Sequence, residues 1–131
     1  MYSSRKISFI ALRSGTSSWR KLPTTPGRYV VVGTKWKDGD VIGLRMPFGF
    51  RLSPVMDQPN LASLFYGPVL LAAEEFGPRA NWRPLTLSAE DLDKSFSGDP
   101  HTLRFQAGDA SFKPFFETYG RHSVYLDVDL K

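Results

Sequence analysis

Residues 28–46 read RYVVVGTKWKDGDVIGLRM, and this stretch decides the expected fold class. The β-branched run at Arg28–Gly33 is typical of a strand bounded by turn-forming residues. Asp38-Gly39 predicts a tight turn, because glycine adopts the positive φ that such turns require. Val41–Met46 then alternates, which places three apolar side chains on one face: Ile42, Leu44 and Met46. The two strands and the turn together predict a β-hairpin.

The rest of the sequence continues this pattern of short strands and turns. Eleven glycines and ten prolines are spread along the 131 residues, which leaves little room for a long helix. Further strands are predicted at Ile7–Leu12, Phe48–Leu52, Ser63–Tyr66, Val69–Ala73, Leu103–Phe105, Phe112–Glu117 and His122–Leu130. One short helix is predicted at Ser88–Phe96, with Ser88 as its N-cap. We therefore expect an all-β fold, an antiparallel β-sandwich or jelly-roll-like domain with at most one short helix.

The connections between these strands follow from their turn-forming residues. Pro54–Asn60 and Gly77–Pro84 are predicted loops, and the second of them carries Trp82. Gly67-Pro68 would break a helix, so this dipeptide predicts a bulge or kink between two short buried strands. In the last strand, the alternation directs four apolar residues to the core: Val124, Leu126, Val128 and Leu130.

The chain is mildly basic, but its charge is not concentrated. A net charge of +4 and a pI near 9.5 favour anionic partners, yet Lys and Arg are interleaved with Asp and Glu. A nucleic-acid-binding β-barrel is therefore the weakest alternative, and no nucleic-acid partner is expected. No apolar run reaches the roughly 20 residues of a membrane-spanning helix, so no membrane partner is expected. Ile7–Leu12 is too short for a secretory signal and is followed by Arg13. We therefore expect a soluble protein, and the sequence does not assign it to a cellular compartment.

The sequence also limits the kinds of active site. It contains no cysteine, which excludes disulfides, thiol catalysis and thiolate metal sites. The two histidines, His101 and His122, are not at ligand spacing, so no metal site is predicted, and no cofactor is expected. The acidic clusters have ordinary structural explanations, so no catalytic residue is assigned. These clusters are Glu74-Glu75, Glu90-Asp91-Asp93 and Asp127/Asp129.

Three segments resemble one family of bacterial enzymes, and they occur in the family's order. Trp36–Ile42 followed by Leu44–Pro47 resembles the stretch W-x-x-G-D-x-V-x-L-x-L-P of glycoside hydrolase family 127-type proteins. These proteins are β-L-arabinofuranosidases and uncharacterised bacterial relatives. Phe65–Ala72 is similar to the segment x-Y-G-P-x-V-L-A that follows in them. Lys113–Glu117 with His122–Leu126 resembles their closing segment, P-F-Y…Q-R-Y-x-V-Y-W.

The resemblance implies a domain organisation. In this family the catalytic residues, a zinc-associated Cys nucleophile and an acid/base Glu, lie in an (α/α)6 barrel N-terminal to the matching region. The resemblance therefore implies a C-terminal β-sandwich that packs on such a barrel and is not an enzyme by itself. Residues 1–25 match no part of the family pattern and are expected to form a separate N-terminal segment. Residues 26–131 are expected to form a single β-sandwich accessory domain.

Sugar binding is the function that the residues themselves support best. Sugar rings have apolar C–H faces that stack on exposed aromatic side chains, while polar side chains bind the hydroxyl groups. The aromatic candidates are Trp36, Tyr66, Trp82, Tyr119 and Tyr125, of which the two tryptophans are expected to be the most accessible. The predicted sugar-contact residues are Trp36, Trp82, Tyr119, Arg121 and His122. For any single aromatic, a place in the core or in an interface is the more common role.

The apolar residues also predict a docking surface. Leu61–Ala73 is more apolar than a lone small domain needs, and five residues add to it: Phe48, Phe50, Phe112, Phe115 and Phe116. The expected partner is the catalytic barrel of a parent enzyme or a second copy of the chain, with an oligosaccharide as a further ligand. The sequence thus predicts a non-catalytic accessory domain of a glycoside-hydrolase-like protein. The first alternative is a free-standing carbohydrate-binding module.

Overall fold

The structure, a computed structural model, describes residues 9–25 and 27–131 and divides into two compact units. The N-terminal unit ends at Phe48, and the C-terminal unit spans Gly49–Lys131. The sequence placed a domain boundary after residue 25. In the structure, strands on both sides of that position pair with each other within the N-terminal unit.

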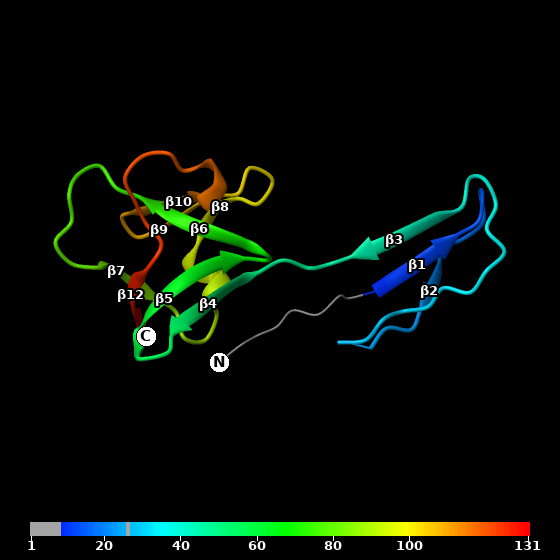
Figure 1. Cartoon of the computed structure of the whole chain (residues 1–131), viewed down its shortest axis with the longest axis horizontal. Helices are drawn as coiled ribbons and strands as arrows, with labels where there is room; N and C mark the ends of the chain where they lie inside the picture. Colours follow the sequence, from blue (N-terminus) through cyan, green and yellow to red (C-terminus); the bar gives the residue numbers. More distant parts are fainter. Residues whose placement is uncertain (1–8, 26) are drawn as a thin grey trace. The chain divides into compact units, whose positions relative to one another are not determined.

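The N-terminal unit is built on a three-stranded antiparallel sheet (Figure 1). Its strands are β1 (Phe9–Arg13), β2 (Arg20–Leu22) and β3 (Val41–Arg45), in the order β2-β1-β3. The predicted strand at Val41–Met46 is confirmed as β3. The predicted strand at Ile7–Leu12 is confirmed as β1 from Phe9 onward, and Ile7 and Ser8 lie outside the described residues.

The predicted hairpin is wrong in its first strand. Residues 28–33 contain no strand, and β3 pairs instead with β1, so that Ile42 lies opposite Leu12. The turn is present, because the backbone amide of Asp40 donates to the carbonyl of Lys37 at 3.2 Å and Gly39 has a φ of 87°. β-Branched residues favour a strand only where a partner strand is available. Here β1 occupies the position beside β3 in which the predicted strand at residues 28–33 would pair.

The two faces of this sheet differ in how they are covered. A Cβ atom on Gly43 would stand 3.1 Å from Trp19 Cζ3, so glycine makes room for the indole ring on one face. The guanidinium of Arg13 lies 4.9 Å from the centroid of the same ring. Ile42 and Leu44 point to the other face because side chains alternate along β3, and they are 51% and 52% exposed.

The C-terminal unit is built on a nine-stranded sheet that is antiparallel except for one parallel pair, β7 with β12. Its strands are β4 (Phe50–Val55), β5 (Gln58–Tyr66), β6 (Val69–Glu74), β7 (Arg83–Leu87), β8 (Ser97–Asp99), β9 (Arg104–Ala107), β10 (Ala110–Pro114), β11 (His122–Ser123) and β12 (Leu126–Leu130). The main path of the sheet is β7-β12-β5-β6-β10-β9-β8, with β4 paired to β5 and β11 paired to β6. Two short 3₁₀ helices are η1 (Leu92–Ser95) and η2 (Phe115–Glu117).

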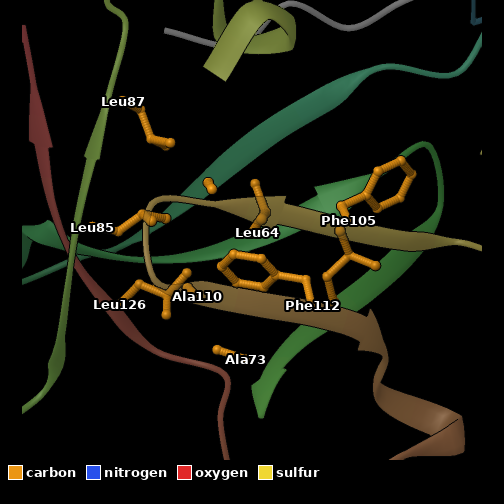
Figure 2. Close-up of a cluster of buried hydrophobic side chains, with 10 residues drawn as sticks. Leu64, Ala73, Leu85, Leu87, Phe105, Ala110, Phe112 and Leu126 are labelled. Atoms are coloured by element: carbon orange, nitrogen blue, oxygen red, sulfur yellow. The ribbon is translucent and has the colours of Figure 1, made fainter. Parts of the chain in front are cut away.

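Both ends of this sheet contribute to one hydrophobic core (Figure 2). Leu85 and Leu87 come from β7 at one end, and Phe105 comes from β9 near the other. Leu64 and Phe112, from the middle of the sheet, are 0% and 1% exposed in the same cluster. A sheet whose two ends share one core curls over it, which gives a sandwich-like half-barrel. The predicted all-β sandwich fold is confirmed.

The apolar segment at Leu61–Ala73 belongs to this core rather than to a docking surface. Its two predicted strand pieces are confirmed within β5 and β6, and a turn at Gly67-Pro68 joins them as an antiparallel hairpin instead of a kink. Leu64 and Leu71 lie opposite each other in the hairpin and are both fully buried. Phe50 and Phe112 also face the core, so they add nothing to an interface. The predicted loop at Pro54–Asn60 is mostly strand, with a turn between β4 and β5.

Two predictions on the segment from residue 77 to residue 96 need correction. β7 begins within the predicted loop, and its inward residues Arg83, Leu85 and Leu87 are all buried. The predicted helix at Ser88–Phe96 is reduced to η1, which is capped by Asp91 rather than by Ser88. Ser88 Oγ instead accepts a hydrogen bond from the backbone amide of Asp91 at 3.3 Å. This local bond satisfies the backbone without a helical turn, which is how serine competes with helix formation.

Candidate functional site

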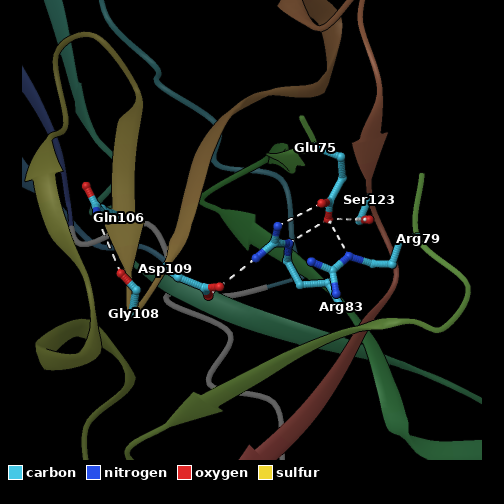
Figure 3. Close-up of polar contacts among 7 residues, drawn as sticks. All are labelled: Glu75, Arg79, Arg83, Gln106, Gly108, Asp109 and Ser123. Carbon is cyan, nitrogen blue, oxygen red and sulfur yellow. Dashed lines mark hydrogen bonds and ion pairs between the residues drawn. The ribbon is translucent and has the colours of Figure 1, made fainter. Parts of the chain in front are cut away.

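A buried polar network is centred on Glu75, in the loop that follows β6 (Figure 3). Arg83 Nε and Nη2 donate to Glu75 Oε1 and Oε2 at 2.6 Å and 2.7 Å. Ser123 Oγ donates to Oε1 at 2.9 Å, and Arg79 Nε lies 3.2 Å from the same oxygen. The side chains of Glu75 and Arg83 are each 7% exposed. One carboxylate therefore ties together β7, β11 and the end of β6.

The donors around Glu75 decide its charge state. The hydrogen bond from Arg83 is the main cause that lowers the pKa of Glu75 from 4.5 to about 2, against the opposing effect of burial. The same hydrogen bond raises the pKa of Arg83. A general acid in glycoside hydrolysis needs a raised pKa, so Glu75 has the wrong electrostatics for that role. Its neighbour Glu74 has a different partner, with Oε2 3.4 Å from Lys113 Nζ.

Two exposed aromatic rings stand beside this network. Trp82 directly precedes Arg83, and Tyr125 lies between Ser123 and the fully buried Leu126. The ring centroids of Trp82 and Tyr125 are 6.0 Å apart, and the ring planes meet at 74° in an edge-to-face arrangement. The two residues are 54% and 44% exposed. Trp82 lies in the loop before β7 and Tyr125 in the connection between β11 and β12, and both segments are anchored on Glu75.

The outer side of β7 and β12 continues the surface that this ring pair begins. In the parallel register, Pro84 lies opposite Asp127 and Thr86 lies opposite Asp129. All four residues are exposed, and on β7 they alternate with buried residues. Asp129 Oδ2 lies 3.5 Å from Lys131 Nζ. We call this surface the β7/β12 face; its residues are Trp82, Pro84, Thr86, Tyr125, Asp127 and Asp129.

The other predicted sugar-contact residues lie elsewhere. Tyr119 and Arg121 are exposed between η2 and β11. His122 is exposed at the start of β11, and its ring is 5.5 Å from the ring of Phe115. His122 Nδ1 also lies 2.8 Å from the carbonyl of Gly120. Trp36 is 51% exposed in the N-terminal unit. Only Trp82 of the predicted set therefore lies on the β7/β12 face.

Sequence reasoning missed the polar members of this face. The sequence gives Asp127 and Asp129 an ordinary structural explanation and assigns no role to Thr86. A signal was present in the sequence of Arg83–Leu87, where Leu85 and Leu87 alternate with Pro84 and Thr86. Tyr66, another aromatic candidate, packs against the core, with its ring centroid 5.0 Å from that of Phe50.

Two further observations apply to residues 9–25 and 27–131. No group of three or more acidic or histidine side chains there is arranged to hold a metal ion. No helix in this part of the chain has the length and apolar character needed to cross a membrane.

The fold and this site define the molecule as an all-β, sandwich-like domain with an exposed aromatic pair. No protein-family model matches the sequence, and no curated protein is significantly similar to it. The resemblance to family 127-type proteins therefore stays a hypothesis that rests on its three segments.

Proposed function

We propose that the chain is a non-catalytic accessory domain of a glycoside-hydrolase-like protein, and that it docks on a catalytic barrel through the N-terminal unit. The observation that carries this proposal is the apolar face of β3. Ile42 and Leu44 are about half exposed there, while the buried apolar residues in the described part of this unit are Ala11 and Leu12. Exposed apolar patches of this kind mark interaction sites.

The size of the N-terminal unit supports the same conclusion. A three-stranded sheet needs one well-buried face to be stable, and units of about 40 residues rarely bury enough surface alone. Burying the β3 face against a partner would give this unit the well-buried sheet face that it lacks. A catalytic barrel with an apolar outer surface is a suitable partner. The family resemblance implies an (α/α)6 barrel as that partner.

The state of Glu75 supports a non-catalytic role. It is the carboxylate with the strongest pKa shift among the described residues, yet that shift keeps it ionised and all its donors are structural. A perturbed carboxylate in a catalytic site would instead hold a proton near neutral pH or face an open cleft. Here the perturbation comes from an ion pair that joins strands.

Docking is tested by mixing the purified chain with the (α/α)6 barrel of a family 127-type enzyme that lacks its own β-sandwich. Size-exclusion chromatography with light scattering should show a one-to-one complex, and the Tm of the barrel should rise. Leu44→Glu should abolish both effects. Val41→Glu is the matched control, since Val41 lies on the same strand but points to the opposite face.

Two results would contradict the docking proposal. One is the absence of a complex at about 100 μM of each partner, which is far above the Kd of stable interfaces. The other is a dimer of the chain alone that Leu44→Glu dissociates, which would assign the face to a second copy. Circular dichroism of each variant establishes that it is folded before either result is interpreted.

A free-standing carbohydrate-binding module is the second candidate. One observation favours it, the exposed pair of Trp82 and Tyr125 in the C-terminal unit. This pair is far from the β3 face in sequence, so the two functions can be tested on separate variants.

A further inference from the structure

The ring pair of Trp82 and Tyr125 forms a corner rather than a flat stack. Because the planes meet at 74°, a ligand ring can stack on the face of one side chain while its edge contacts the other. Large aromatic side chains usually bury most of their surface, and these two leave about half of theirs in solvent. The corner therefore offers apolar surface to a ligand with a ring of its own.

The corner is held in place by the Glu75 network. Arg83, next to Trp82, makes two hydrogen bonds to Glu75, and Ser123 makes a third from the segment that leads to Tyr125. A site whose side chains are fixed before the ligand arrives loses less conformational entropy on binding. The buried ion pair thus positions the two rings without touching a ligand.

Polar groups extend from the corner along the β7/β12 face. Residues two apart on one side of a strand are separated by roughly 7 Å, so Asp127 and then Asp129 follow Tyr125 over roughly 14 Å. Thr86 adds a hydroxyl that can both donate and accept a hydrogen bond. Asp127 has no ion-pair partner within the described residues, so its carboxylate is available to accept hydrogen bonds from a ligand's hydroxyl groups. The row is longer than one sugar ring.

The charges around the corner favour a neutral ligand over a cationic one. Aromatic rings with nearby carboxylates also bind ammonium groups. Here the guanidinium of Arg79, three residues before Trp82, is paired with Glu75, and Lys131 offsets the charge of Asp129. The chain as a whole carries a net charge of +4. This net positive charge disfavours a cationic ligand, and a neutral polyol can still form hydrogen bonds with Asp127 and Thr86.

We propose that the β7/β12 face binds a neutral oligosaccharide, with Trp82 and Tyr125 stacking against one sugar ring and Asp127 and Thr86 binding hydroxyl groups of the next. This inference deepens the carbohydrate-binding candidate and does not depend on docking through β3. Either proposal can fail while the other holds, because they use different residues in different units.

The test follows the indole N–H signals of the whole chain by heteronuclear NMR. The three tryptophans, Trp19, Trp36 and Trp82, give one such signal each, and Trp82→Ala assigns the third by its disappearance. The probes are arabinohexaose, xylohexaose and cellohexaose, each added up to about 10 mM, ten times the weak end of the expected Kd range of about 0.1–1 mM. The Trp82 signal should shift saturably with at least one of these sugars.

Binding to the variants is measured by isothermal titration calorimetry. Trp82→Ala should weaken binding by about ten-fold or more, and Trp82→Phe should recover part of the loss because the ring face is kept. Asp127→Ala should weaken binding by about three- to ten-fold. Trp19→Ala is the matched control, a tryptophan that is 49% exposed in the other unit, and its affinity should equal that of the unchanged chain.

The dependence of affinity on salt concentration distinguishes a neutral ligand from a cationic one. Affinity for a neutral sugar should stay constant between about 0.05 M and 0.5 M NaCl, whereas binding of a cation to Asp127 would weaken as charges are screened. A peptide carrying trimethyl-lysine serves as the cationic probe. Shifts of Trp82 that occur only with this peptide would assign the corner to a cation and overturn the proposal. A folded chain whose Trp82 signal is unmoved by all three sugars would overturn it as well.

Discussion

The guanidinium of Arg83 and the carboxylate of Glu75 meet in a two-point ion pair, at 2.6 Å and 2.7 Å, with both side chains 7% exposed. A guanidinium that makes two parallel hydrogen bonds to one carboxylate fixes the relative orientation of the two groups as well as their distance. The pair joins the loop after β6 to β7, and Ser123 adds β11 to the same carboxylate. The geometry of this end of the sheet therefore depends on one charge.

Removal of that charge should destabilise the C-terminal unit. Glu75→Gln leaves the buried guanidinium of Arg83 with the exposed Asp109 as its counter-charge, and we expect the free energy of unfolding to fall by about 3 kcal/mol. Urea denaturation followed by circular dichroism measures the change. Asp109→Asn is the control, since Asp109 lies 3.3 Å from Arg83 but is 88% exposed. It should cost less than about 0.5 kcal/mol, and an equal loss in both variants would contradict the assignment.

Stability should also depend on the protonation of Glu75. Its pKa is lowered to about 2 in the folded chain from an ordinary 4.5, mainly by the hydrogen bond from Arg83. The stabilisation is therefore complete above pH 4.5 and is lost as the pH falls toward 2. Because solvent reaches the network at Arg79, we expect a contribution of about 2 kcal/mol. The stability gap between the unchanged chain and Glu75→Gln should narrow by that amount on acidification, and a constant gap would rule the linkage out.

Gly98 in β8 should tolerate no side chain. Its φ is 139°, and a Cβ atom there would stand 2.1 Å from the carbonyl oxygen of Arg104 and 2.8 Å from Phe105 Cα. These are backbone atoms of the paired strand β9, so relief requires the strands to separate. Gly98→Ala should lower the free energy of unfolding by about 3 kcal/mol. Gly120→Ala is the control with open space around the Cβ, and its effect in the same urea measurement should be about 0.5 kcal/mol or less.

Leu126 in β12 should contribute far more than Leu130 in the same strand. Leu126 is fully buried between β5 and β7, whereas Leu130 is 51% exposed. Leu126→Ala should therefore cost about 3 kcal/mol of unfolding free energy, and Leu130→Ala about 1 kcal/mol or less. Thermal unfolding followed by calorimetry compares the two. Similar values would mean that β12 packs differently from the register described above.

The fold was predicted from the sequence wherever the pattern was local. Alternation predicted β3, and the apolar runs on either side of Gly67-Pro68 predicted β5 and β6, although this dipeptide forms a hairpin turn and not the predicted kink. The prediction was wrong at Arg28–Gly33, where β-branched residues satisfy the propensity for a strand but have no partner edge, since β1 pairs with β3. It also missed β7, because Gly77–Pro84 was interpreted as a loop. Proline is tolerated there because β7 is an edge strand and the ring lies on the exposed side.

The candidate site was predictable only in part, since it is created by a long-range pairing. Exposure of Trp82 followed from its place near a turn-rich loop. Its proximity to Tyr125 could not be predicted, because that contact requires β7 and β12 to run parallel, with Arg83 beside Leu126. The same holds for Ser123 and Glu75, which are brought together when β11 pairs with β6. Single-sequence patterns report which face a residue occupies and not which distant strand lies next to it.

The parallel placement of β12 has a consequence for the order in which the protein is made. β7 joins the sheet through β12, which is synthesised only after residues 88–125. Until then Leu85 and Leu87 have no neighbouring strand, and the emerging chain holds an open, apolar edge that a chaperone or another nascent chain can engage. The C-terminal unit therefore closes late and through contacts between distant parts of the chain, which makes its folding slow compared with a helical domain of the same size.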